Sequence, residues 1–240
     1  MAKVLATFVD PRHLTPAAMA AMRARFGQGE NRHLVIDKFV SPQLLALLDR
    51  VVREEGEFED NLKLASAARA PRDSDQQTPR GKVDAATFAA APESDRFIRQ
   101  KRLVGPRPGF EQGLGSKADR MVRQMLASQP LHQWLGAITG MALHRTGGIN
   151  LKLHGEGHYL HPHSDARPGR QLCAVLYVHQ AWDAAHGGEF VLHLADGEQL
   201  RFAPEPGRLV LFDVTQTNVH TVAPVTASDV WRVNYTAWFG

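Results

Sequence analysis

Closely spaced turn signals divide residues 141–240 into short β-type runs, and this division constrains the fold more than any other feature of the chain. The signals recur every 8–12 residues or so, which is the spacing of an all-β sandwich or barrel. They are Gly147-Gly148, Gly155, Pro168-Gly169, Gly187-Gly188, Asp196-Gly197 and Pro206-Gly207. The strands expected between them cover residues 149–154, 172–178, 189–194, 199–202, 208–213, 219–223 and 230–238.

Residues 1–140 carry helical signals instead. Thr15-Pro16 predicts the start of a helix over 15–26, because threonine caps a helix and proline suits its first turn. Ser41-Pro42 predicts a second helix start, directly after an expected strand over 33–40. Further helices are expected over 116–128 and 130–139.

Between these helices, residues 65–108 are rich in Pro, Gly, Ser, Asp and Arg and show little apolar periodicity. A segment of this length without regular structure is typical of a mobile lid, a binding loop or disorder. We therefore expect a flexible segment within an N-terminal support region of helices and a strand, residues 1–140. Residues 141–240 are expected to form a β core, and the two regions to make one integrated, mainly β domain of the α+β class.

The composition is ordinary for a folded globular protein, with 43% hydrophobic and 22% charged residues among 240. A formal net charge of +3 is too mild to indicate a nucleic-acid partner by itself. A single cysteine, Cys173, excludes an intramolecular disulfide and is typical of a reducing compartment. The N-terminal apolar run is too short for a signal peptide, and no stretch reaches the ~18 apolar residues of a membrane span. We therefore expect a cytoplasmic protein without membrane contact.

Histidines concentrate in the β region, where ten of the twelve lie at or after His132. His163 and Asp165 are two positions apart, so on an extended backbone both side chains point to one face and can bind one metal ion. His220 lies in a later predicted strand. Two imidazoles and one carboxylate form a facial triad that leaves coordination positions open, as in non-haem Fe(II) oxygenases. His161 with His163 is a competing, zinc-like pair.

Six motifs follow one another in this region: GHYLHPHSD (157–165), LCAVLYVHQAW (172–182), GGEF (187–190), PGRLVLF (206–212), HTVAPV (220–225) and WRVNYTAW (231–238). Together they resemble the catalytic domain of the prolyl-hydroxylase-like 2-oxoglutarate dioxygenases. The resemblance is specific for the superfamily but not for proline as the substrate. It implies a double-stranded β-helix, which is a jelly-roll, cupin-like barrel, with buttressing helices. It also implies Fe(II), 2-oxoglutarate as cosubstrate and dioxygen.

The resemblance assigns roles to individual residues. The iron ligands that it implies are His163, Asp165 and His220. Arg232 would pair with the distal carboxylate of 2-oxoglutarate, for which the planar guanidinium is better suited than a lysine ammonium. Tyr177 would donate its hydroxyl to the same carboxylate. His154 stands near the place where many members carry a tyrosine, and it could replace that tyrosine as a donor to 2-oxoglutarate.

The substrate contacts are less well defined. His179 stands where the family commonly has asparagine, and it is a candidate substrate contact together with Tyr159 and Arg102. We expect hydroxylation of an unactivated C–H bond of an amino acid or other small metabolite, with release of succinate and carbon dioxide. A small molecule is favoured over a protein as the substrate, and the sequence leaves the oligomeric state open.

Four alternatives remain. The first is a protein side-chain hydroxylase of the prolyl type. The second is an alkylation-repair-like dioxygenase acting on nucleic acid, suggested by Arg232-x-Asn234-x-Thr236 but disfavoured because Trp238 stands where those enzymes carry a further arginine. The third is a non-catalytic cupin-like binding module, and the fourth is a zinc hydrolase that uses His161 with His163.

Overall fold

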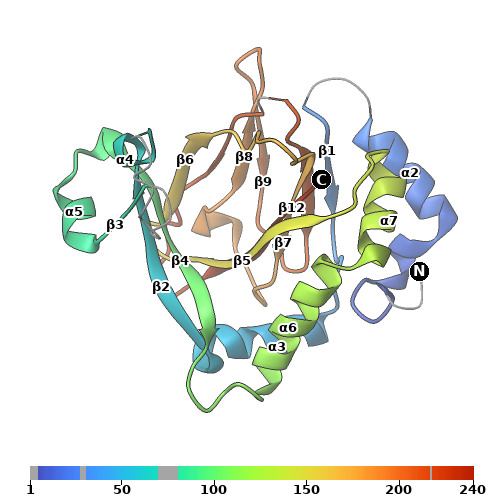
Figure 1. Cartoon of the computed structure of the whole chain (residues 1–240), viewed down its shortest axis with the longest axis horizontal. Helices are drawn as coiled ribbons and strands as arrows, with labels where there is room; N and C mark the ends of the chain where they lie inside the picture. The colour runs from blue at the N-terminus through green and yellow to red at the C-terminus, as the bar shows by residue number, and fades with distance from the viewer. Residues whose placement is uncertain (1–4, 28–30, 70–80, 217) are drawn as a thin grey trace.

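The computed structural model describes residues 5–27, 31–69, 81–216 and 218–240, and its strands form one curled antiparallel sheet (Figure 1). Two groups of four neighbouring strands make the barrel, and side chains from both groups line one interior cavity. The first group is β10 (Leu209–Asp213), β7 (Leu172–Tyr177), β12 (Arg232–Phe239) and β5 (Thr146–His154). The second is β6 (Tyr159–His163), β11 (His220–Val222), β8 (Phe190–His193) and β9 (Gln199–Phe202). This arrangement confirms the expected double-stranded β-helix.

Two further strands lie at the two edges of the first group. One of these two strands also pairs with the second group. β1 (His33–Ile36) pairs with β10 at one edge. β4 (Arg96–Pro106) pairs with β5 through Lys101 and Arg102 and with β6 through Ile98 and Arg99. β4 therefore bridges the groups on one side of the cavity.

The central strand β7 explains why this sequence forms a layered core. All six of its residues are buried, and they alternate between two clusters. Leu172, Ala174 and Leu176 join the cluster shared with the helices. The intervening residues, Cys173, Val175 and Tyr177, join the cluster inside the barrel. A strand that is buried on both faces is made of consecutive apolar residues, and LCAVLY is such a run.

The helices begin as their capping residues predict. The side chains of Thr15, Ser41 and Ser128 accept hydrogen bonds from backbone N–H groups in the first turns of three helices, each with proline in its first turn. These helices are α2 (Pro16–Phe26), α3 (Pro42–Arg50) and α7 (Gln129–Thr139). α2 packs on α7, and α3 packs on α6 (Leu114–Leu126) and continues into a π-helical turn over Val51–Glu55. Figure 1 shows all four on the same side of the sheet. No helix in the described part of the chain is long and apolar enough to cross a bilayer.

The expected absence of regular structure over 65–108 is wrong for much of that segment. β2 (Gly56–Leu64) and β4 pair along their whole length and form a long antiparallel ribbon beside the cavity. Residues 70–80 lie outside the described residues, and mobility of the segment stays a prediction. The elements found between β2 and β4 are α4 (Ala65–Arg69), β3 (Lys82–Val83), α5 (Ala85–Ala90) and a 3-10 turn over Glu93–Asp95.

A polar contact ties α6 to the barrel. The hydroxyl of Tyr235 on β12 donates to Oδ1 of Asp119 at 2.6 Å, and Nε of Arg123 contacts both carboxylate oxygens of Asp119 at 2.9–3.0 Å. Because Tyr235 and Asp119 are buried, water cannot replace the lost donor if the hydroxyl is removed.

We expect Tyr235→Phe to lower the free energy of unfolding by about 1–3 kcal/mol, because the buried carboxylate of Asp119 loses the hydrogen bond from the tyrosine hydroxyl. Urea unfolding measures the change. Tyr159→Phe is the matched control, because the Tyr159 hydroxyl makes no hydrogen bond within the described part of the chain. Equal stability of Tyr235→Phe and the wild type would contradict a stabilising role for this contact.

Candidate metal centre

Strand pairing brings the predicted triad together. His163 ends β6, Asp165 follows two residues later, and His220 begins β11. His220 and His163 are register partners in the β6–β11 pair, and their ring centroids lie 4.1 Å apart. One potential ligand atom from each of the three residues lies within 4.8 Å of the other two. The three side chains can therefore bind one metal ion.

Both histidines present the same nitrogen to this site. Nδ1 of His163 lies 3.0 Å from the carbonyl oxygen of His161, and Nδ1 of His220 lies 3.1 Å from that of Asn218. A carbonyl can only accept, so each Nδ1 carries the proton and each Nε2 keeps a free lone pair for a metal. Burial, and then the neighbouring His220, lower the pKa of His163 to about 4, which keeps this ring neutral at neutral pH.

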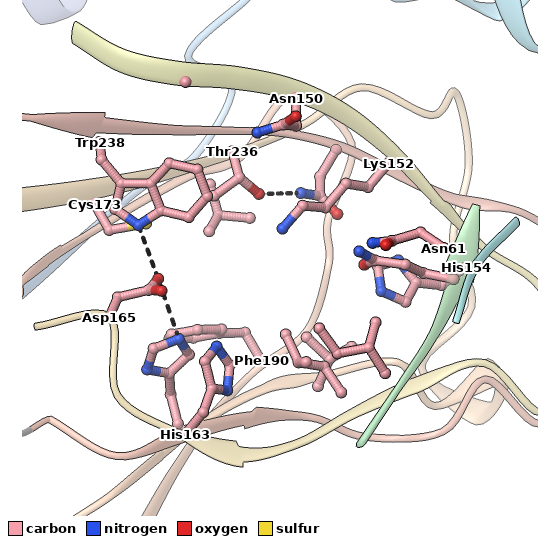
Figure 2. Close-up of a pocket in the computed structure, with 18 of the residues that line it drawn as sticks. Asn61, Asn150, Lys152, His154, His163, Asp165, Cys173, Phe190, Thr236 and Trp238 are labelled. Atoms are coloured by element: carbon pink, nitrogen blue, oxygen red, sulfur yellow. Dashed lines mark hydrogen bonds and ion pairs between the residues drawn. The ribbon is translucent and has the colours of Figure 1, made fainter. Parts of the chain in front are cut away.

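Asp165 is oriented by its neighbours rather than left free. Nε1 of Trp238 donates to Oδ2 of Asp165 at 2.9 Å, and Nε2 of His220 lies 3.6 Å from the same oxygen (Figure 2). Burial alone would raise the pKa of Asp165, but the neighbouring His220, then His163 and the hydrogen bond from Trp238, hold it well below its usual range. Asp165 is therefore an anionic ligand whose carboxylate plane is fixed by an indole.

This donor set fits Fe(II). Two neutral imidazole nitrogens and one carboxylate on one side of a metal leave positions open for further ligands, as in non-haem iron oxygenases. His161 is not part of the group, because its ring stacks on Tyr159 at a centroid distance of 4.5 Å. The structure therefore contradicts the competing zinc-like pair of His161 with His163.

A cavity of about 360 Å³ opens beside the triad. Its wall is polar along β12 and β5, where alternate residues face inward. β12 contributes Arg232, Asn234, Thr236 and Trp238. β5 contributes Asn150, Lys152 and His154. The opposite wall includes Phe97, Ile98, Leu160 and Val222.

Arg232 is a buried cation without a carboxylate partner in the described part of the chain, and it is only 1% exposed. Its Nη2 donates to the Tyr177 hydroxyl at 3.1 Å, its Nε to the Gly188 carbonyl at 2.7 Å and its Nη1 to Oδ1 of Asn234 at 2.5 Å. Burial lowers the pKa of Arg232, because a charged guanidinium is costly away from water. A carboxylate ligand such as that of 2-oxoglutarate would offset this cost.

His154 supplies a second donor at the same end of the cavity. Nη1 of Arg232 lies 3.3 Å from Nδ1 of His154, so this nitrogen accepts and the proton resides on Nε2. Nε2 is buried and has no hydrogen-bond partner among the described residues. Burial, and then the charge of Arg232, lower the pKa of His154 well below its ordinary value. A neutral, unpartnered donor beside Arg232 fits a carboxylate ligand, which is the cosubstrate role predicted for His154.

The remaining predicted residues divide into two groups. Arg102 lines the cavity, and Tyr177 contacts Arg232 from behind without lining it. His179 and Tyr159 do not line the cavity, and their assignment as substrate contacts stays a prediction. Both ring nitrogens of His179 bind backbone groups, namely the Pro204 carbonyl and the Val233 N–H, and Tyr159 packs against a separate apolar cluster.

Sequence reasoning missed three residues that shape the site. Trp238 was considered only as the replacement of an arginine, yet its indole binds Asp165. Lys152 and Asn234 are register partners on β5 and β12, and both line the cavity. The alternation of Arg232, Asn234, Thr236 and Trp238 was the signal that could have identified this wall, because residues two apart on a strand share a face.

We expect Trp238→Phe to weaken Fe(II) binding by about tenfold, because the variant loses the hydrogen bond that orients Asp165 as a metal ligand. Anaerobic equilibrium dialysis of Fe(II) measures the change. Trp231→Phe, at an indole that is 40% exposed, is the control and should bind like wild type. Equal affinities of the Trp238 variant and wild type would contradict the orienting role.

Comparison with known proteins agrees with this geometry. Residues 149–240 match the family described as the 2OG-Fe(II) oxygenase superfamily. Prolyl 3-hydroxylase OGFOD1 of Xenopus laevis is 28% identical over 117 residues, which make up 46% of this chain and 23% of that protein. The mouse protein of the same name is 26% identical over 121 residues, 48% of this chain and 22% of its own. The match thus spans about a quarter of the length of these relatives.

Solved structures share the fold. A prolyl-4-hydroxylase of Pseudomonas putida superimposes with a TM-score of 0.58 at 20% identity, over 92% of this chain and 97% of that one. A prolyl hydroxylase of Trichoplax adhaerens, in complex with a hypoxia inducible factor peptide fragment, gives a TM-score of 0.62 at 16% identity, over 92% and 89%. With its triad and barrel in place, the matched region of the chain, residues 149–240, is a catalytic core of the 2OG-Fe(II) oxygenase superfamily.

Proposed function

We propose that this oxygenase hydroxylates a side chain of a protein or peptide, and that proline is the target residue. The relatives and structures described above carry the name prolyl hydroxylase, and one of them was solved with a peptide fragment. These names favour the protein alternative over the small metabolite that the sequence led us to expect. We therefore revise the expected substrate class.

The observation that carries the proposal is the position of the triad within the cavity. His163 and Asp165 line the cavity together with the buried Arg232, while Arg167 of the same wall is exposed at the surface. A cosubstrate held at Arg232 would leave the exposed side of the cavity for a substrate that approaches from solvent. The ring of Phe97 lies edge-on to His163 at a centroid distance of 5.7 Å, and it offers an apolar surface to a compact ring such as that of proline.

The chain's own residues would bind and orient the reactants. Arg232 and His154 would hold the distal carboxylate of 2-oxoglutarate, and His163, Asp165 and His220 would hold Fe(II). When bound, iron, 2-oxoglutarate and dioxygen supply an oxidant strong enough for an unactivated C–H bond, which no side chain can supply. Trp238 would keep the carboxylate of Asp165 in place throughout.

We expect proline-containing peptides to stimulate succinate release and to gain one oxygen atom on proline, as measured by mass spectrometry. His220→Ala, which removes one predicted metal ligand, is the control and should abolish both signals. Free amino acids and small metabolites are screened in parallel. Stimulation and oxygen transfer by a small metabolite alone, with none by any peptide, would contradict the proposal.

A further inference from the structure

The cavity wall carries more positive charge than iron and 2-oxoglutarate can use. Asp165 is the single carboxylate among the described residues of the wall. The positively charged residues of the wall are Lys63, Arg102, Lys152, Arg167, Arg170 and Arg232. Fe(II) and the 2-oxoglutarate dianion cancel each other's charge, and Asp165 cancels that of Arg232. Arg102 already pairs with Glu59 at 2.8 Å. By this count a net charge of +4 remains on the wall, carried by Lys63, Lys152, Arg167 and Arg170, of which Arg170 lies 3.6 Å from Asp165.

Lys152 is the innermost of the four. It lies directly opposite Arg102 in the register of β4 and β5, and like charges opposite each other destabilise a sheet. Its ammonium lies 5.6 Å from the centre of the Trp238 ring, and it makes no ion pair with a carboxylate in the described part of the chain. Figure 2 shows the side chain extending into the cavity between Asp165 and His154. A half-buried ammonium in this position needs an anion from outside the protein.

The other three cations surround the same space. Lys63 comes from β2, and burial, then the charges of Arg167, Arg102 and Lys82, lower its pKa. Arg170 lies over the Trp238 ring at 4.2 Å, and its Nη1 is 3.6 Å from Oδ1 of Asp165. Repulsion among these closely spaced cations destabilises the folded protein, and a bound anion would offset this repulsion.

We propose that Lys63, Lys152, Arg167 and Arg170, the cationic wall, bind acidic side chains next to the hydroxylated residue of a peptide substrate. This inference rests on the proposed function and narrows its substrate class to acidic segments. Arginine forks and lysine ammonium groups are the usual partners of carboxylates, and partial burial strengthens such pairs relative to surface pairs.

An acidic peptide suits the cationic wall better than nucleic acid does. Proteins that bind single strands combine basic residues with free aromatic faces on which bases stack. Among the aromatic rings of the cavity, Trp238 already has Arg170 and Lys152 over its face, and Phe97 packs edge-on to His163. The cations are also gathered at one cavity rather than spread along a strip that could follow a phosphate backbone.

Fluorescence anisotropy tests the inference on protein loaded with Mn(II) in place of Fe(II) and with 2-oxoglutarate. The probes are labelled peptides with one proline flanked by Glu, by Ser or by Lys. We expect the Glu peptide to bind most tightly and its affinity to fall between about 50 and 300 mM salt, because screening weakens charge pairing. The double variant Lys63→Met and Arg167→Gln should weaken its binding by about tenfold and leave 2-oxoglutarate affinity unchanged. The double variant Lys117→Met and Arg120→Gln, at two exposed positions of α6, is the charge-matched control.

Four outcomes decide between these readings. Equal binding of the Glu and Ser peptides, or an unchanged Glu affinity in the folded double variant, overturns the inference. Tighter binding of a single-stranded oligonucleotide than of the Glu peptide also overturns it. If the Glu peptide binds through the cationic wall but no peptide gains oxygen with Fe(II), the proposed function fails while acidic recognition stands.

Discussion

The site depends on the antiparallel pairing of β6 with β11, because this pairing makes His163 and His220 register partners. The two imidazoles come from distant parts of the chain, and no local contact could hold them together. Each ring is also tied to a backbone carbonyl through Nδ1, so the barrel sets both the position and the tautomer of the ligands. A shift of one residue in this register would turn one ligand away from the cavity.

Charge organises the rest of the cavity. Arg232 is buried beside His154 at one end, and both offer donors that the described protein does not fully use. Asp165 fixes the metal end, where Trp238 orients it. Between and around them the cationic wall carries an excess of positive charge, and bound anions would offset the repulsion within it. In the function that we propose, cosubstrate and substrate recognition would both depend on the positive charge of this one cavity.

The sequence predicted the barrel, the triad and a place for Arg232 near the triad. These features could be recognised from turn signals, a pair of residues two positions apart and motifs in a fixed order. It did not predict the β2–β4 ribbon, whose strands mix charged and apolar residues without clear alternation. The sequence did not show that His179 and Tyr159 lie outside this cavity, because the face of a residue depends on register and on bulges that a single sequence does not reveal. The sequence also could not show that Lys152 lines the cavity, because its neighbours Arg102 and Asn234 lie on other strands.

The most direct test of the metal centre is the visible charge-transfer absorption that forms when Fe(II) and 2-oxoglutarate bind together without oxygen. Wild type should develop the band, and His220→Ala should lose it. Arg232→Met should need a much higher 2-oxoglutarate concentration to form the band, because the guanidinium that would bind the distal carboxylate is removed. Folding of each variant is checked by circular dichroism. A folded wild type without the band, or a folded His220→Ala variant that keeps it, would contradict the account.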